Sequence, residues 1–404
     1  MRKNGVNKEV CEISGGICAP KGFIAGGIPC NILQNPQFVS RETKYSKKND
    51  LGLLIAEERY PAAGVFSKAG EKSAFFSITE KSLQEGFLRA VLVQGGVTNA
   101  YGETGRKNVI KMRLAVAKHA TIREEDVLVV STGAVGVRFP LQNALDGIST
   151  LIPSCGNGQE QALAFAEALG GWDEKGKSFA FSFALGDVAC KIGAVCTNTT
   201  SNVCILTTDV RITQEMLDKA LQSAVAQTFA LSEIGGTVSP TDGVYILTSG
   251  KAGNYTISAN DSEYKKFAYA LKEALGKICL SIARKTETDV AFVCKVAQAR
   301  SFRSASEAAK AIVRANDVKS GLKTGRFTID SVLNAIHAAG ESFDVEKIEV
   351  SLLFFDEKLV LFDCGRTIPA DIKTRLQEKG EREIILHVSF KDGNYSATSI
   401  GRIL

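Results

Sequence analysis

The sequence contains no apolar run that approaches the ~20 consecutive residues needed to cross a bilayer. Its N-terminal stretch, MRKNGVNKEVCEISGG, also lacks the continuous apolar segment of a secretory signal. We therefore expect a cytoplasmic protein without membrane contacts, whose ten cysteines are reduced. No cysteine has CxxC spacing and most lie among apolar residues, which favours core packing over metal binding or disulfides.

Histidine is scarce in the sequence. The three copies, His119, His337 and His387, are far apart, and none has a carboxylate or second histidine at ligand spacing. A histidine-based zinc site or catalytic triad therefore has little to build on, and we expect no metal. The net charge of +5 comes from mixed residues without an arginine stripe or basic tail, so nucleic acid is not an expected partner. Any chemistry must come from hydroxyls, amides, lysines and carboxylates.

What the sequence does contain is a mixture of strand and helix patterns. Strands come in pairs and helices follow in pairs, which favours an α+β fold of layered sheets and helices over strict βαβ alternation. The predicted strands are 52–59, 87–94, 126–132, 177–184, 187–195, 202–208, 243–248, 289–299, 347–355, 358–363 and 383–390. The predicted helices are 107–120, 141–151, 159–169, 214–231, 262–284, 305–315, 329–339 and 369–379.

One short motif suggests a nucleotide site but has the wrong context. Residues 171–178, GWDEKGKS, match the phosphate-binding pattern G-x-x-x-x-G-K-[ST]. That loop requires a strand before it and a helix after it, because the helix N-terminus holds the phosphates. Here a helix pattern precedes the glycines and a strand pattern follows Ser178. We interpret the segment as a helix end followed by an exposed turn.

A run of hydroxyl and amide side chains stands just before an apolar strand in residues 196–209, CTNTTSNVCILTTD. Together with the residues before it, this stretch resembles the self-cleaving segment of the ornithine acetyltransferase family, the bifunctional glutamate N-acetyltransferases of arginine biosynthesis. The family pattern is Lys-Gly-Ser-Gly-Met-Ile-x-Pro-Asn-Met-Ala-Thr, followed by an apolar strand that ends in Thr-Thr-Asp. Counting back from Asp209, the family's nucleophilic threonine falls on Ser201, its asparagine on Asn198, and its lysine on Lys191 if one residue is deleted.

Other segments resemble the same family in the same order. Residues 15–28, GGICAPKGFIAGGI, are similar to its opening, and residues 50–74 to its next segment. QGGVTNAYGETG (94–105) resembles its Asn-Ser-Gly-Asn-Ala-Asn-Ala-x-Thr-Gly loop, and VVSTGAVGVRFP (129–140) resembles its Ser-Thr-Gly-Val-Ile-Gly loop.

The resemblance implies a layered α/β sandwich of the self-processing, N-terminal-nucleophile-like type. It implies cleavage between Thr200 and Ser201, which gives an alpha-chain segment, 1–200, and a beta-chain segment, 201–404, with a smaller C-terminal α/β subdomain at about 290–404. The two cleaved chains are expected to form an oligomer. The implied reaction moves an acetyl group from N-acetylornithine to glutamate without an obligatory cofactor, with acetyl-CoA as an alternative donor.

The resemblance also assigns roles to residues. Ser201 is the nucleophile, and its own α-amino group, freed by cleavage, is the base that a serine hydroxyl needs. Thr132 and Gly133 stabilise the oxyanion, Lys191 meets a substrate carboxylate, and Glu287 holds a substrate ammonium. Structural roles stay open for each: a turn at Ser201, a strand end at Thr132 and Gly133, a solvated Lys191, and a surface ion pair at Glu287.

The sequence departs from the family pattern in several places. Serine replaces threonine at the nucleophile, the family's Met-Thr-Thr-Asp appears as GGWD (170–173), and its Gly-Glu-Asp-Pro-Asn-Trp-Gly-Arg signature falls on TGRFTIDS (324–331). The chain also ends at YSATSIGRIL, short of a family segment that contributes to the ornithine site. Three hypotheses follow: an ornithine acetyltransferase, a paralogue that acts on a different acyl group as an acyltransferase or amidohydrolase, and an uncleaved, non-catalytic relative that binds a partner.

Overall fold

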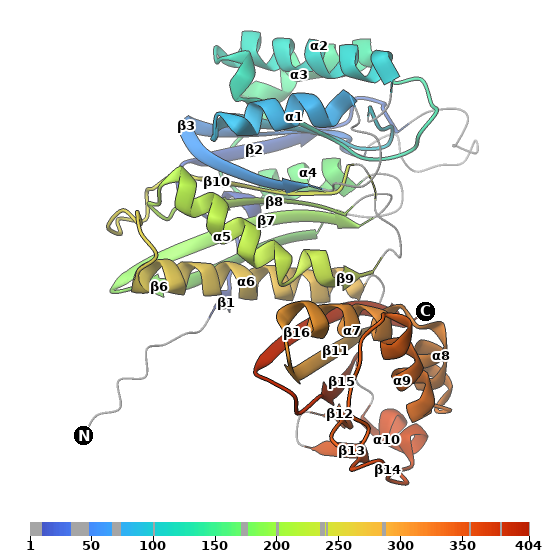
Figure 1. The fold of residues 1–404 in the computed structure, drawn as a ribbon. Helices are drawn as coiled ribbons and strands as arrows, with labels where there is room; N and C mark the ends of the chain where they lie inside the picture. The colour runs from blue at the N-terminus through green and yellow to red at the C-terminus, as the bar shows by residue number, and fades with distance from the viewer. Residues whose placement is uncertain are drawn as a thin grey trace. The chain divides into compact units, whose positions relative to one another are not determined.

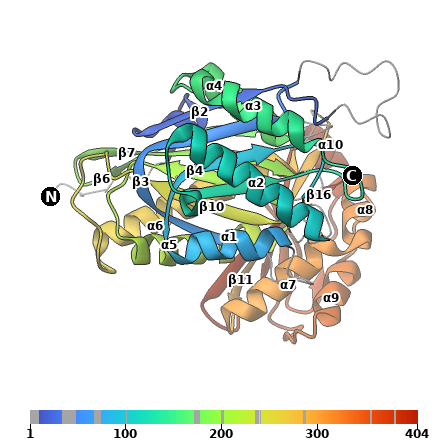
Figure 2. The same ribbon diagram turned by 90° about the horizontal axis from the view of Figure 1, so that it is seen from above.

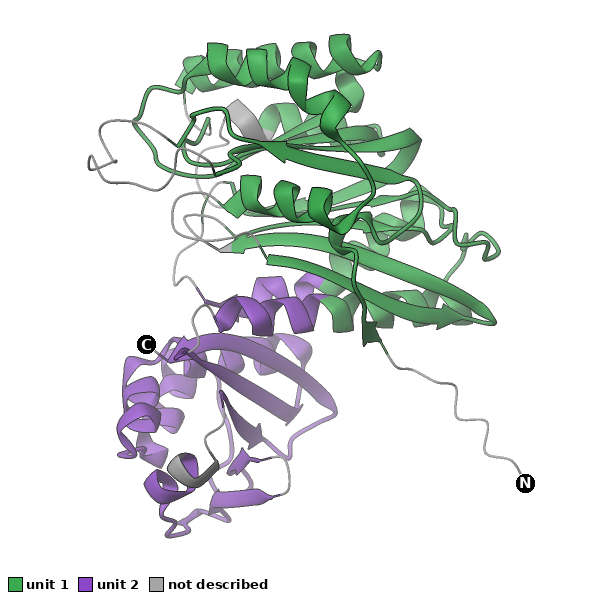
Figure 3. Cartoon of the chain, turned by 180° about the vertical axis from the view of Figure 1, so that it is seen from behind, with its two compact units in different colours: residues 1–224, 238–274 green, residues 225–237, 275–404 purple. Residues whose placement is uncertain are grey.

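The computed structural model describes residues 10–33, 48–66, 74–99, 102–170, 177–198, 202–234, 239, 241–284, 288–354, 357–379 and 382–403 (Figure 1). The chain divides into two compact units, residues 1–224 with 238–274 and residues 225–237 with 275–404 (Figure 3). The residues of the predicted C-terminal subdomain, 290–404, lie in the second unit.

The first unit is built around one long, folded sheet. Its strands run in the order β1-β6-β7-β8-β10-β3-β4-β5, with β2 paired to β3. The pairs β8–β10 and β4–β5 are parallel, and the others are antiparallel. The strands are β1 (Cys11–Glu12), β2 (Phe23–Ile28), β3 (Leu51–Phe66), β4 (Phe87–Gln94), β5 (Val127–Ser131), β6 (Lys177–Leu185), β7 (Val188–Asn198), β8 (Asn202–Thr208) and β10 (Gly243–Thr248).

Strand β3 belongs to both halves of this sheet. Its first residues pair with β2 and β4, whereas residues 62–66 pair with β10. The register with β4 shifts between Ile55 and Tyr60, and such an irregularity lets a strand bend from one layer into another. A shared core contains Leu54 and Val91 from one half and Val203 from the other, so the two halves enclose common apolar side chains.

Helices cover these layers, as Figures 1 and 2 show from two directions. Met112 and Val116 of α2 and Ile148 of α3 pack with Leu53 of β3, because their apolar faces repeat at helical spacing. Phe165 of α4 lies in the core between the sheet halves, and Phe267 of α6 contacts the β6 half with its ring. The helices are α1 (Ala74–Gln84), α2 (Gly102–Ala120), α3 (Leu141–Ser154), α4 (Gln159–Gly170), α5 (Gln214–Ala226) and α6 (Ser262–Ala283), with short 3-10 turns at η1 (Gly16–Cys18) and η3 (Glu124–Asp126). The ends of α5 and α6, from Val225 and Leu275 onward, are assigned to the second unit.

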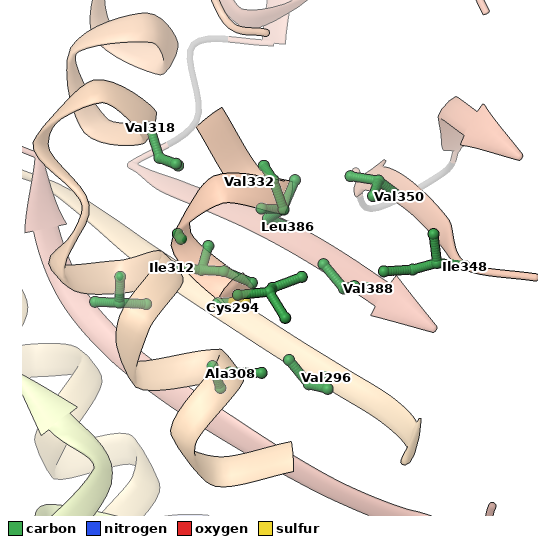
Figure 4. Packing of buried hydrophobic residues seen from close by; sticks show 14 of the residues in the cluster. Cys294, Val296, Ala308, Ile312, Val318, Val332, Ile348, Val350, Leu386 and Val388 are labelled. Carbon is green, nitrogen blue, oxygen red and sulfur yellow. The ribbon is translucent and has the colours of Figure 1, made fainter. Parts of the chain in front are cut away.

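The second unit is a sheet with helices on one face. The strand order is β14-β13-β12-β15-β11-β16-β9. Side chains of the helices, such as Ile312 and Val332, meet Cys294 and Leu386 of the strands in a buried cluster (Figure 4). The elements are η4 (Phe229–Leu231), β9 (Ser232–Glu233), β11 (Val290–Ala299), α7 (Phe302–Arg314), α8 (Asn316–Thr324), α9 (Ile329–Ala338), β12 (Glu349–Leu353), β13 (Lys358–Asp363), β14 (Arg366–Thr367), α10 (Ile372–Lys379), β15 (Glu383–Ser389) and β16 (Tyr395–Ile403).

The predicted α+β class is confirmed, because both units combine mixed or antiparallel strand pairing with helices packed on the sheets. The order predicted around the phosphate-loop motif is also confirmed: α4 ends at Gly170 and β6 begins at Lys177. The predicted helix 214–231 is too long, since α5 ends at Ala226. Within the described ranges, no helix is both long and apolar enough to cross a membrane.

Candidate active site

The predicted cleavage junction connects two paired strands. β7 ends at Asn198 and β8 begins at Asn202, and these two residues are register partners in an antiparallel pair. The three residues between them, 199–201, therefore join the strands of a hairpin. Thr200 and Ser201 themselves lie outside the described residues. The strand predicted at 202–208 matches β8 residue for residue.

An aspartate that the sequence analysis missed lies beside this junction. The Oδ1 atom of Asp242 accepts a hydrogen bond from the backbone N–H of Asn202 at 2.6 Å, and its Oδ2 atom accepts one from Ser239 N–H at 2.9 Å. Burial raises the pKa of the Asp242 carboxyl, and the two N–H donors oppose that shift by favouring the charged form. The carboxylate thus holds the backbone immediately after Ser201.

The position of Asp242 follows from sheet topology. Gly243, the next residue, begins β10, and it is the parallel register partner of Val203 in β8. Because parallel strands start at the same edge of a sheet, the residue before β10 lies next to the start of β8. The sequence signal is an aspartate directly before an apolar strand. It becomes informative only when β10 is known to be the parallel neighbour of β8.

The two loops that resemble the family are brought together in the structure. The loop after β4, within 94–105, and the loop after β5, within 129–140, form a parallel bridge between Val97 and Ala134. Thr98 N–H donates to the carbonyl of Ala134 at 2.9 Å. Parallel pairing of β4 with β5 explains this arrangement, because the loops leave from the same edge of the sheet.

A buried polar network fixes these loops. The hydroxyl of Ser131 accepts the backbone N–H of Asn99 at 2.8 Å, and the Asn99 amide donates to Gln94 Oε1 at 2.6 Å. Asn108 of α2 donates in turn to Asn99 Oδ1 at 2.9 Å. These side chains are each less than a tenth exposed, so their hydrogen bonds must be made within the protein.

Gly133 occupies a position that other residues do not fit. Its φ is +126°, a backbone conformation that side chains disfavour. A Cβ atom there would lie 2.2 Å from the carbonyl carbon of Gly96 and 2.3 Å from its oxygen. The glycine is therefore required for the close approach of the two loops.

The neighbouring Thr132 is fully buried, and both its backbone and its side chain are engaged. Its N–H donates to the carbonyl of Gln94 at 3.0 Å, and its hydroxyl donates to the carbonyl of Leu169 at 3.1 Å. Leu169 lies in the last turn of α4, where carbonyls lack partners within the helix. The hydroxyl therefore ties the loop after β5 to the end of α4.

The loop after β5 and the junction hairpin face the same core. Val130 of β5, Leu169 of α4, and Val195 and Val203 of the hairpin belong to one buried cluster. Thr197 lies on the same face of β7 as Val195, because side chains alternate along a strand. Its hydroxyl is buried and has no hydrogen-bond partner in the structure as described. It is the second polar group near the junction that the sequence analysis missed.

Lys191 lies at the other end of the hairpin. It stands seven residues before Asn198 on β7, a separation of about 23 Å along a strand. Its backbone N–H donates to Asp209 Oδ1 at 2.8 Å, and its carbonyl accepts the hydroxyl of Thr208 at 2.7 Å. Thr208 and Asp209, which end the Thr-Thr-Asp sequence, therefore hold Lys191 of β7 beside the end of β8. Glu287 lies outside the described residues.

A pocket of about 600 Å³ is also found at this far end of β8. Its lining includes Lys21, Tyr60, Arg211 and Lys251. Lys251 forms an ion pair with Glu57, and Arg211 donates to the carbonyl of Gly250 at 3.3 Å. The pocket is separated from the junction by the length of β8, so it is not part of the site formed around the hairpin.

A model of the ArgJ family matches residues 37–402 of the sequence. The chain belongs to the ArgJ family. The predicted membership in the ornithine acetyltransferase family is confirmed, and with it the prediction of an enzyme of arginine biosynthesis at the level of the family. The assignments of Ser201, Thr132, Gly133, Lys191 and Glu287 stay predictions.

Alignments with proteins named ArgJ cover most of the chain. The arginine biosynthesis bifunctional protein ArgJ of Caldanaerobacter subterraneus subsp. tengcongensis is 29% identical over 401 residues, which cover 96% of this chain and 95% of that protein. ArgJ of Lactococcus lactis is 29% identical over 364 residues, with 87% and 86% covered.

Solved ArgJ-family structures match part of the chain. The bifunctional protein ArgJ of Bacillus halodurans is 27% identical with a TM-score of 0.41, covering 47% of this chain and 94% of that one. Ornithine acetyltransferase of Mycobacterium tuberculosis, solved in complex with ornithine, is 28% identical with a TM-score of 0.40, covering 47% and 96%.

Proposed function

We propose that this ArgJ-family chain cleaves itself between Thr200 and Ser201 and then transfers an acetyl group from N-acetylornithine to glutamate through an acetyl-Ser201 intermediate. The observation that carries the proposal is the hydrogen bond from the N–H of Asn202, the residue that follows Ser201 in the sequence, to the partly buried carboxylate of Asp242. Family membership and the names of the relatives support the choice of reaction.

Self-cleavage begins with the Ser201 hydroxyl. Its oxygen attacks the carbonyl of Thr200, and the acyl group moves from nitrogen to oxygen, which turns the peptide bond into an ester and frees the amine. Water then hydrolyses the ester, leaving a carboxylate on Thr200 and an N-terminal Ser201. Asp242 contributes by restraining the backbone on the downstream side, so that the hydroxyl stays close to the carbonyl it attacks.

The new α-amino group serves as the base for acetyl transfer. Its unperturbed pKa of about 7.7 to 8.0 lets it accept the hydroxyl proton near neutral pH. The Ser201 oxygen attacks the acetyl carbonyl of N-acetylornithine, and the proton passes to the departing amine of ornithine. The amine of glutamate then attacks acetyl-Ser201, which completes a ping-pong exchange without a metal or obligatory cofactor.

The loop at Thr132 and Gly133 is proposed to stabilise the oxyanion in both steps. Support comes from its rigid construction and from the apolar core it shares with the hairpin. The Thr132 hydroxyl carries one proton, which it donates to Leu169 in this structure. To serve the oxyanion, that hydroxyl must exchange the Leu169 carbonyl for the substrate oxygen, a rotation about one side-chain bond.

A second candidate is transfer or hydrolysis of a different acyl group by the same nucleophile. Residues 324–331, where the family signature is absent, connect two helices: Gly325 ends α8 with a φ of +70°, and Thr328 accepts the N–H of Ser331 at the start of α9. The segment therefore has a local structural role here. Glu287 remains a proposed contact for the ammonium of an amino-acid substrate. The position of Lys191, about 23 Å along β7 from Asn198, does not support the predicted contact with the carboxylate of a substrate held at Ser201.

Trapping of the acyl-enzyme tests the proposal. The protein is mixed with N-acetylornithine, quenched in acid, and the 204-residue fragment that begins at Ser201 is weighed. We expect one added acetyl group, which glutamate removes and acetyl-CoA restores if it also serves as a donor. A cleaved fragment that is acetylated by neither donor contradicts the acetyl-transfer reaction and favours the second candidate.

A further inference from the structure

Two cysteines lie directly opposite each other on either side of the proposed cleavage junction. Cys196 of β7 and Cys204 of β8 are register partners. Opposed residues in an antiparallel pair have Cα atoms about 4.5 to 5.5 Å apart, within the range of about 4.4 to 6.8 Å found across disulfides. Their Sγ atoms are 2.6 Å apart. The two sulfurs thus already face each other at a distance closer to the disulfide bond length of about 2.05 Å than to an ordinary contact between two thiols.

Both thiols are buried on one face of the hairpin. Val195 and Val203 point into the core between the sheet halves, so Cys196 and Cys204, one residue further along each strand, point to the opposite face. Each side chain is fully buried. They lie two residues from the strand ends at Asn198 and Asn202, where local opening of the hairpin exposes them most readily.

We propose that Cys196 and Cys204 form a reversible disulfide across the cleavage junction. Cys196 lies before Ser201 and Cys204 after it, so the bond would join the two chains covalently once cleavage has occurred. That consequence rests on the proposed self-cleavage. The disulfide itself does not, because the two cysteines are opposed in the intact chain.

The oxidant is a small disulfide such as oxidised glutathione. One cysteine thiolate attacks a sulfur of the small disulfide and expels one small thiol, forming a mixed disulfide. The second cysteine thiolate then displaces the other small thiol and forms the Cys196–Cys204 bond. The two thiol protons end on the two small thiols, so two cysteines are oxidised and one small disulfide is reduced.

Peptide mapping of the complete protein tests the pairing. The protein is equilibrated with oxidised glutathione, alkylated under denaturing conditions, and digested with trypsin without reduction. Trypsin cuts after Lys191 and Arg211, so both cysteines fall in residues 192–211. In an uncleaved chain we expect this peptide without alkyl groups and lighter by two hydrogen atoms. In a cleaved chain we expect peptides 192–200 and 201–211 joined, and separated by reduction.

The test of the disulfide does not depend on self-cleavage, because peptide mapping detects the linkage whether or not the Thr200–Ser201 bond is cut. Substitution C294A, which removes another fully buried thiol, should leave the linkage unchanged, whereas C204A should abolish it. Wild-type mapping decides alone if C204A does not fold. Full alkylation of both residues, under conditions in which the exposed Cys11 and Cys364 become glutathionylated, would overturn the proposal.

Discussion

The carboxylate of Asp242 holds the backbone N–H of Asn202 at 2.6 Å, one residue after the proposed nucleophile. The sequence separates the two by 40 residues, and the parallel pairing of β8 with β10 brings them together. This contact restrains the backbone on the C-terminal side of the proposed cleavage junction.

Substitution D242A removes both hydrogen-bond acceptors and should slow self-cleavage, because the backbone after Ser201 loses its restraint. Hydrogen bonds to charged groups contribute about 1.5 to 3 kcal/mol, so we expect a rate loss of about 10-fold or more. The time course of cleavage, followed by intact mass, measures this. D146A removes an exposed carboxylate from α3 and should cleave at the parental rate. Equal rates for the two variants would show that Asp242 does not act at the junction.

Substitution G133A should disrupt the loop at the proposed oxyanion site. A Cβ there meets the backbone of Gly96 at 2.2 Å, and backbone atoms cannot move aside without displacing the loop. Loss of an oxyanion donor typically reduces the rate by about 10² to 10³.

The matched control is G136A, since Gly136 also has a positive φ, of +80°, but its Cβ would meet no atom within 4 Å. We expect acetyl transfer to survive in G136A and to fall in G133A. Similar transfer rates in both variants contradict the proposed role of the loop.

Two substitutions at Thr132 distinguish a catalytic role of its hydroxyl from a structural one. T132V leaves the buried carbonyl of Leu169 without its donor, which should lower the free energy of unfolding by about 1 to 3 kcal/mol. T132S retains the hydroxyl and should behave like the parent. If Thr132 also serves the oxyanion, T132V lowers kcat as well as the melting temperature. A lower melting temperature with unchanged kcat restricts Thr132 to tying the loop to α4.

His387 should make the second unit sensitive to acid. Burial lowers the pKa of its imidazole from the ordinary 6.5, Lys358 and Lys295 lower it further, and Glu349 opposes them. The unfolded chain then binds a proton that the folded chain does not, so stability present above pH 6.5 is lost as the pH falls through the lowered pKa.

H387Q should flatten the fall in melting temperature between pH ~7.5 and ~5. H119Q, which replaces the exposed histidine near the end of α2, serves as the matched control. An unchanged slope in H387Q would mean that other groups govern the acid response.

Local patterns predicted most of the first unit, because its strands alternate and its helices carry continuous apolar faces. β8 was predicted to the residue, since its polar start and apolar run mark both ends. α1 and α8 were missed, as was β16 with its sequence YSATSIGRI, where glycine and hydroxyl residues hide the strand pattern. The positions of residues near the junction also depend on pairing between strands that are distant in the sequence, which local sequence patterns do not predict. The roles of Asp242 and Thr197 depend on strand neighbours, and the separation of Lys191 from the junction depends on the strand register.

The central claim is that the chain cuts itself at Ser201, and intact mass of the purified protein tests it most directly. The account predicts that the 43.2 kDa chain is replaced by two fragments of 200 and 204 residues, the second beginning at Ser201, and that S201A stays whole. An undivided parental chain of 43.2 kDa, or an S201A variant that still splits after Thr200, would contradict it.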